Sequence, residues 1–86
     1  SDVYKRQGKL LALNPTTYTI LEMLVKSAPN VVTREDIGFK LWQENEPNND
    51  VLRSHIYQLR NQLDKPFEQQ ILITVPKIGF RLETEA

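Results

Sequence analysis

The chain has 86 residues, of which 40 % are hydrophobic and 26 % charged, a composition typical of one globular domain of ordinary type. It has no cysteine, which excludes disulfides and thiolate metal sites. Lys plus Arg and Asp plus Glu each total 11, so the formal net charge is zero. This balance does not favour a broadly basic nucleic-acid binder, but it leaves room for a local basic surface.

Neither a membrane span nor a secretory signal is expected from the hydrophobicity pattern. No apolar run approaches the roughly 20 residues that a transmembrane helix needs. The polar start SDVYKRQGK lacks the apolar core of a signal peptide. We therefore expect a soluble cytoplasmic protein, with residues 1–86 forming a single domain.

The first 30 residues predict a small hairpin followed by a helix. Extended segments are expected at 3–6 and 9–13, separated by Gln7-Gly8, where glycine supplies the positive φ of a tight turn. Asn14-Pro15 marks a helix start, because Asn is a good N-cap and Pro fits the first helical position. Its inward face is expected to consist of the following residues: Tyr18, Leu21, Leu24, Val25 and Ala28. Pro29-Asn30 ends the helix.

A second helix is predicted after the short extended link Val31-Val32. Thr33 is the expected N-cap, in a pattern similar to a capping box with Asp36 in the place of the usual Glu or Gln. The residues expected to pack inward are Ile37, Leu41 and either Phe39 or Trp42. The acidic, proline-containing stretch 43–47 is expected to form a loop.

A long amphipathic helix is predicted over 48–64, with Asn48 or Asn49 as its N-cap, and the rest of the chain is organised around it. Leu52, Ile56, Leu59 and Leu63 are spaced four, three and four residues apart, which places them in one apolar stripe. At about 100° per residue, the following residues point away from that stripe: Asp50, Ser54, Tyr57, Gln58 and Asn61. Arg53 and Arg60 lie on one flank of the helix, and His55 and Gln62 lie on the other.

The last segment predicts a second hairpin, with strands at 71–75 and 80–84 rich in β-branched and aromatic residues. Pro76-Lys77-Ile78-Gly79 joins them and places Lys77 near the tip. The predicted fold is α+β: three helices with a small N-terminal hairpin and a C-terminal hairpin, which is the winged helix-turn-helix arrangement.

Catalytic residues are scarce. The chain has one histidine, and neither a phosphate-binding loop, a nucleophile elbow nor a zinc-protease motif is present. His55 is interpreted as a structural or merely exposed residue, because one histidine cannot build a typical zinc site. We expect no enzymatic activity, no cofactor and no metal.

The pattern favours DNA binding, because the polar face of the long helix fits a major groove about 12 Å wide. Lys77 and the hairpin beside it can reach phosphates or the adjacent minor groove. Two alternatives remain open: a solvated helix surface, and a winged-helix module that binds another protein instead of DNA. Tyr57 on the exposed face favours an interface of some kind, since aromatic residues are enriched there.

Three stretches, in the right order, also resemble the OmpR/PhoB-type winged-helix effector domains of bacterial transcription regulators. LNPTTYTILEMLVKSAPNVVTREDIGFKLW resembles the start, helix pair and closing Trp of that family. HIYQLRNQLD is similar to its recognition-helix signature, and TVPKIGFRL is similar to its wing. The resemblance covers nearly the whole chain from Leu10 onward, and it implies a fragment of a longer regulator.

The resemblance implies roles for individual residues. Gln58 matches a base-reading position, and Ser54, Tyr57 and Asn61 share its face. Positions that hold the DNA backbone in the family are matched by three residues: Trp42, Arg60 and Thr74. Arg53 and Lys77 complete the expected backbone and wing contacts. The resemblance further implies contact of loop 43–48 with RNA polymerase, as in some members of the family, head-to-tail dimers on DNA and monomers when free.

The sequence also departs from the family pattern. Pro76-Lys77 stands where many members have Arg-Gly, and Val-Pro-Lys is similar to the wing of ToxR/CadC-type regulators. Tyr57 and Gln58 occupy positions that often hold two arginines, and Asp50 replaces a basic residue. These differences predict weaker intrinsic DNA affinity and more dependence on dimerisation.

Overall fold

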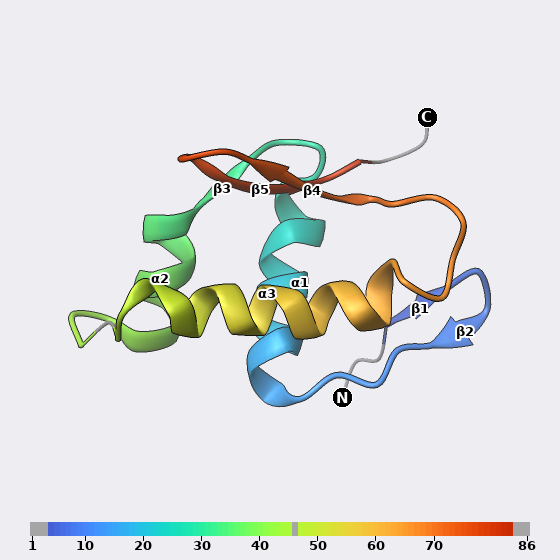
Figure 1. Ribbon diagram of the computed structural model, residues 1–86, viewed down its shortest axis with the longest axis horizontal. Helices are drawn as coiled ribbons and strands as arrows, with labels where there is room; N and C mark the ends of the chain where they lie inside the picture. The colour runs from blue at the N-terminus through green and yellow to red at the C-terminus, as the bar shows by residue number, and fades with distance from the viewer. Residues whose placement is uncertain (1–3, 46, 84–86) are drawn as a thin grey trace.

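The computed structural model describes residues 4–45 and 47–83, arranged as three helices and two small antiparallel sheets. The elements in chain order are β1 (Lys5–Arg6), β2 (Lys9–Leu10), α1 (Pro15–Ser27), β3 (Val32–Thr33), α2 (Arg34–Trp42), α3 (Asn49–Leu63), β4 (Leu72–Val75) and β5 (Gly79–Leu82). In Figure 1, α3 runs across the molecule with α1 behind it, the β3–β5–β4 sheet lies along one side, and the β1–β2 hairpin lies near the end of α3. This arrangement is the predicted winged helix-turn-helix.

The helix starts agree with the predicted caps. Asn14 caps α1 in a full capping box with Thr17, and Pro15 is its first residue. Thr33 caps α2 by accepting a hydrogen bond from the Asp36 N–H at 3.0 Å. Asn48 caps α3 in the same manner through the Asp50 N–H. The three caps satisfy backbone donors that the helices leave free at their first turns.

The predicted apolar stripe of α3 is confirmed, since all four of its residues are buried in the core. The opposing surface comes from α1, α2 and the sheet, with the fully buried side chains Ile20, Leu21, Leu24, Ile37 and Leu72 at its centre. Helix α3 is thereby fixed on one side. Its outer side remains accessible.

One inward-facing prediction was wrong, and the alternative between Phe39 and Trp42 is decided in favour of Trp42. Val25 is 43 % exposed, and Thr17 and Ile20 occupy the buried face of α1 in its place. Phe39 is 62 % exposed, because the short helix α2 turns Ile37 and Gly38 into the core. Trp42, the other residue considered there, packs partly buried against the core.

The first hairpin is shorter than predicted, with paired residues at 5–6 and 9–10. Both turn residues, Gln7 and Gly8, have positive φ, as a two-residue type I′ turn requires. Val3, which was expected to begin the first strand, lies outside the described residues, and so does Thr84 at the predicted end of the last strand.

The C-terminal hairpin gains a third strand that was not predicted from the sequence. Residues Val32 and Thr33 pair antiparallel with Phe80 and Gly79, so β5 is the central strand in the order β3–β5–β4. This pairing connects the start of α2 directly to the hairpin. The hairpin is therefore held as part of the domain and does not project from it alone.

Gly79 is required by this close approach of strands. A Cβ at position 79 would overlap the carbonyl oxygen of Val32 and lie 2.8 Å from the Cα of Thr33. Replacing Gly79 with alanine therefore forces β3 away from β5. We expect Gly79→Ala to lower the free energy of unfolding by about 2–3 kcal/mol in urea titrations, the range typical of overpacking.

Gly8→Ala is the matched control. Gly8 has a φ of +80°, and among the described residues no neighbouring atom lies within 4 Å of the place that an alanine Cβ would take. Only backbone strain of about 1–2 kcal/mol is therefore expected. Weaker destabilisation by Gly79→Ala than by Gly8→Ala would contradict the proposed strand clash.

Candidate nucleic-acid interface

The outer face of α3 is open to solvent along most of its length. Ser54, Tyr57 and Gln58 are exposed, and the Tyr57 side chain is among the most exposed large residues at 64 %. Asn61 is half-buried near the end of the helix. Residues 4–45 and 47–83 leave this face uncovered, so the polar surface predicted from the sequence is present.

A pocket with a volume of about 280 Å³ lies between α3 and the β3–β5–β4 sheet. Its lining consists of Arg34, Arg53, Ile56, Tyr57, Arg60, Thr74 and Phe80. Three guanidinium groups thus gather around one cavity. Each carries five N–H donors in a planar fork, the geometry that suits phosphate oxygens.

Arg34 was not identified from the sequence as a site residue. It is the first residue of α2, and its guanidinium carbon lies 4.8 Å from the centre of the Phe80 ring. Its backbone N–H donates to the carbonyl of Ile78, which follows from the pairing of β3 with β5. Because β3 is only two residues long, the sequence has no periodic pattern that would predict its pairing with β5 or the place of Arg34 beside it.

Arg60 and Thr74, to which the family resemblance gives contacts with the DNA backbone, are in contact with each other. The Arg60 guanidinium donates to the Thr74 hydroxyl at 3.0 Å and to the Leu72 carbonyl at 2.5 Å. Two of its five donors therefore hold β4 against α3. The remaining donors lie at the edge of the pocket.

Lys77 lies at the tip of the β4–β5 hairpin and is exposed. The Ile78 N–H donates to the Val75 carbonyl at 3.0 Å across a turn that has Pro76 second and Lys77, with φ of 68°, third. This is the type II arrangement, in which the third residue needs a positive φ. Arg53 is also exposed, and it forms a 3.8 Å ion pair with the equally exposed Asp50.

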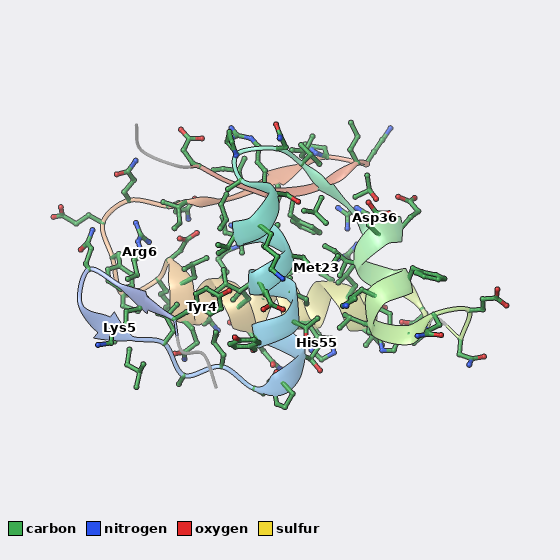
Figure 2. The ribbon with its side chains drawn as sticks, turned by 180° about the vertical axis from the view of Figure 1, so that it is seen from behind. Tyr4, Lys5, Arg6, Met23, Asp36 and His55 are labelled. Carbon is green, nitrogen blue, oxygen red and sulfur yellow. The ribbon has the colours of Figure 1, made fainter. Side chains whose placement is uncertain are left out.

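Trp42 lies at the end of α2 and contacts the flank of α3. Its ring centre is 6.2 Å from that of His55, and both residues are half-buried. Figure 2 shows His55 on the helix beneath α1, away from the open face. The packing of Trp42 supports the position of α2 against α3, which is a structural contribution in itself.

Asp64, immediately after α3, is only 2 % exposed and connects three parts of the domain. Its carboxylate accepts from the N–H groups of Ile71 and Leu72, each at 3.0 Å. It also lies 3.9 Å from the Arg60 guanidinium. Asp64 and Arg60 together satisfy both the N–H and the carbonyl of Leu72 on the outer edge of β4.

Arg6 is a further partner of Asp64, at 3.1 Å. Arg6 also donates to the carbonyls of Leu63 and Gln69 and stacks over the Phe67 ring at 4.5 Å. Figure 2 shows Arg6 extending from the hairpin toward the segment that follows α3. The first hairpin is thereby joined to the same carboxylate that positions β4.

Within residues 4–45 and 47–83, no group of three or more His, Asp or Glu side chains is arranged to hold a metal ion. Among the helices of the described chain, none is both long and apolar enough to cross a membrane.

The sequence matches the family model described as "Transcriptional regulatory protein, C terminal" over residues 8–82. The chain belongs to this family. The transcriptional regulatory protein CutR of Streptomyces coelicolor is 36 % identical over 78 residues, which cover 90 % of this chain and 35 % of CutR. The chain thus spans about a third of the length of such relatives.

Solved structures of family members have the same fold. The DNA-binding domain of the response regulator AdeR, in complex with an intercistronic region, is 28 % identical with a TM-score of 0.76, over 94 % of this chain and 84 % of that one. The DNA-binding domain of Escherichia coli CadC is 25 % identical with a TM-score of 0.79, over 96 % and 79 %. The predicted OmpR/PhoB-type winged-helix fold is confirmed. The family to which the domain belongs is a family of DNA-binding domains and not of enzymes.

The buried carboxylate of Asp64 gives a prediction for stability. In Asp64→Asn the new amide faces two backbone N–H donors and leaves Arg6 without its counter-charge. We expect the free energy of unfolding to fall by about 3–5 kcal/mol, as for a broken buried pair, when measured by urea denaturation.

The control for Asp64→Asn is Glu22→Gln, which removes an exposed pair with Lys26 at 3.9 Å. This change is expected to alter stability by less than about 1 kcal/mol. Equal stability losses in the two variants would show that the Asp64 cluster does not hold the domain together.

Proposed function

We propose that this domain binds specific sequences of double-stranded DNA as the effector part of a bacterial transcription regulator. Helix α3 would lie in the major groove, which admits one α-helix. The β4–β5 hairpin would lie against the adjacent backbone or minor groove. The observation that carries this proposal is the open polar face of α3 directly beside a pocket lined by three arginines.

In this proposal the residues divide by the part of DNA they contact. Base edges are assigned to the following residues of α3: Ser54, Tyr57, Gln58 and Asn61. Phosphates are assigned to Trp42, Arg53, Arg60, Thr74 and Lys77, and we add Arg34 because it lines the same pocket as Arg53 and Arg60. Base contacts give specificity, and phosphate contacts set orientation and most of the non-specific affinity.

The zero net charge is compatible with this proposal because the positive groups are not spread evenly. Three arginines line a single pocket, and the buried carboxylate of Asp64 is paired most closely with Arg6, which is not one of them. The same pocket also favours DNA over the alternative of a protein-binding module. Tyr57 lies among guanidinium groups there and not in a neutral apolar patch.

Further partners follow from family membership. We propose that the loop at 43–48, of which Glu46 lies outside the described residues, contacts RNA polymerase. On DNA the domain would form head-to-tail dimers on repeated half-sites and be monomeric when free. A cytoplasmic location is proposed because a bacterial chromosome is found there.

Phosphate contacts predict a uniform loss of affinity on charge removal. Arg53→Ala and Lys77→Ala should each weaken binding to all duplexes and reduce the slope of log affinity against log salt by about 0.9. Fluorescence anisotropy with a labelled duplex at several salt concentrations measures both quantities. Lys26→Ala, on the outer side of α1, is the control, and the wing assignment fails if Lys77→Ala behaves like it.

Base reading predicts a different effect for Gln58. Gln58→Ala should weaken the preference for particular bases at one or two base pairs by about fivefold or more. The slope of log affinity against log salt should stay unchanged, because no phosphate contact is lost. Selection from a library of randomised duplexes, followed by titration of single base-pair variants, provides the measurement. An unaltered preference at every position would remove Gln58 from the base-reading set.

A further inference from the structure

We propose that Asn14, the N-cap of α1, determines which base edges Gln58 can read. The inference rests on the proposed base-reading role of Gln58 and deepens it. Asn14 and Gln58 are 44 residues apart in the chain, yet the Asn14 Nδ2 donates to the Gln58 Oε1 at 3.3 Å. The two amides therefore form a pair at the edge of the open face of α3.

The orientation of the Asn14 amide is fixed by its role as a helix cap. Its Oδ1 accepts from the Thr17 backbone N–H at 2.8 Å and from the Thr17 hydroxyl at 3.0 Å. A backbone N–H can only donate, so the oxygen of Asn14 must occupy that side of the amide. The capping box closes with the Asn14 N–H donating to the Thr17 hydroxyl at 3.0 Å. The amide nitrogen consequently points away from α1.

This orientation in turn fixes Gln58. Because Nδ2 of Asn14 carries only donors, the Gln58 atom that faces it must be the acceptor oxygen. The Nε2 group, with its two N–H donors, is then directed away from Asn14. Gln58 is exposed, so those donors are open to a ligand on the outer side of α3.

The segment carrying Asn14 is held along α3 independently of Gln58. The Ala12 backbone N–H donates to the Gln62 Oε1 at 3.1 Å, one turn further along the helix. Leu11, just before it, is buried in the core. Asn14 is thus kept beside α3 by contacts that a change at position 58 does not remove.

The chemical consequence is a donor-only reader. A glutamine with a free amide reads adenine in a bidentate manner, accepting from N6 and donating to N7. With its oxygen turned toward Asn14, Gln58 loses that mode. It donates instead to acceptors in the major groove, which are O6 and N7 of guanine, O4 of thymine and N7 of adenine. Guanine and thymine are preferred among these, because their edges carry acceptors alone, whereas N7 of adenine lies beside the N6 donor. Asn14 is therefore a positioning residue for specificity, without touching DNA itself.

Asn14→Asp is the decisive substitution. Aspartate is as good an N-cap as asparagine, so α1 is retained, but the atom facing Gln58 becomes an acceptor. The Gln58 amide is then expected to turn its Nε2 inward and its oxygen outward. At the base pair that responds to Gln58→Ala, the preference should move from guanine or thymine toward adenine or cytosine, by about fivefold or more.

Asn14→Ser is the matched control, because serine also caps the helix but has no donor that replaces Nδ2 at that distance. It should flatten the preference at the same base pair without reversing it. The readout is the ranking of four duplexes that differ at this one pair. The negative charge that Asn14→Asp adds lowers the affinity for all four duplexes equally. The charge by itself therefore does not change their ranking.

Failure of this inference can be told apart from failure of the proposed function. If Gln58→Ala changes no base preference, the base-reading assignment is wrong and the inference falls with it. If Gln58→Ala relaxes one position while Asn14→Asp keeps the original ranking and Asn14→Ser keeps the full size of the preference, only the role of Asn14 is overturned. Thermal melting curves recorded by circular dichroism show that each variant is folded.

A second measurement needs no DNA. In a nitrogen-15 NMR spectrum of the free 86-residue chain, the side-chain amide signals of Asn14 should shift on Gln58→Ala and stay in place on Lys26→Ala. Unmoved Asn14 signals in Gln58→Ala would overturn the pairing on which the inference depends.

Discussion

The arrangement of this domain depends on one buried carboxylate. Asp64 ends α3, accepts two backbone N–H groups at the start of β4, and faces Arg6 and Arg60. Burying a charge is costly unless it is paired and hydrogen-bonded, and here both carboxylate oxygens receive donors. A single residue thereby joins the end of the helix to the start of the hairpin, one of whose strands lines the arginine-containing pocket.

Three arginine side chains are concentrated at one pocket in this molecule, which explains how a chain of zero net charge can present a basic surface. Arg6 is neutralised inside the domain, and Arg60 divides its donors between β4 and the pocket edge. Arg34 and Arg53 complete the pocket from the start of α2 and from α3. Since salt screens the interaction between surface charges beyond roughly 10 Å, an anion at this pocket would respond to the local cluster of arginines more than to the net charge of the chain.

The sequence predicted those features that depend on periodicity or on local capping. The stripe from Leu52 to Leu63 and the caps at Asn14, Thr33 and Asn48 all follow from short-range chemistry. The strand β3 and the role of Arg34 did not, because two-residue pairing leaves no periodic pattern. The Asp64 cluster was also missed, since its partners lie up to 58 residues away in sequence. The choice between Phe39 and Trp42 stayed open for a related reason: a nine-residue helix has too few turns for the sequence to define its inner face.

The open face of α3 is bounded on both flanks by groups that the fold holds in place. On one flank Arg60 is tied to β4, and on the other Gln58 and Gln62 are tied to the segment before α1. Side chains restrained before binding lose less rotational entropy when a ligand arrives, so fewer contacts are needed for a given affinity. A domain with zero net charge benefits most from such restraint. In the proposal made for Asn14, the same hydrogen bonds limit which groups Gln58 offers, so that the packing of α1 against α3 would contribute to selectivity as well as to stability.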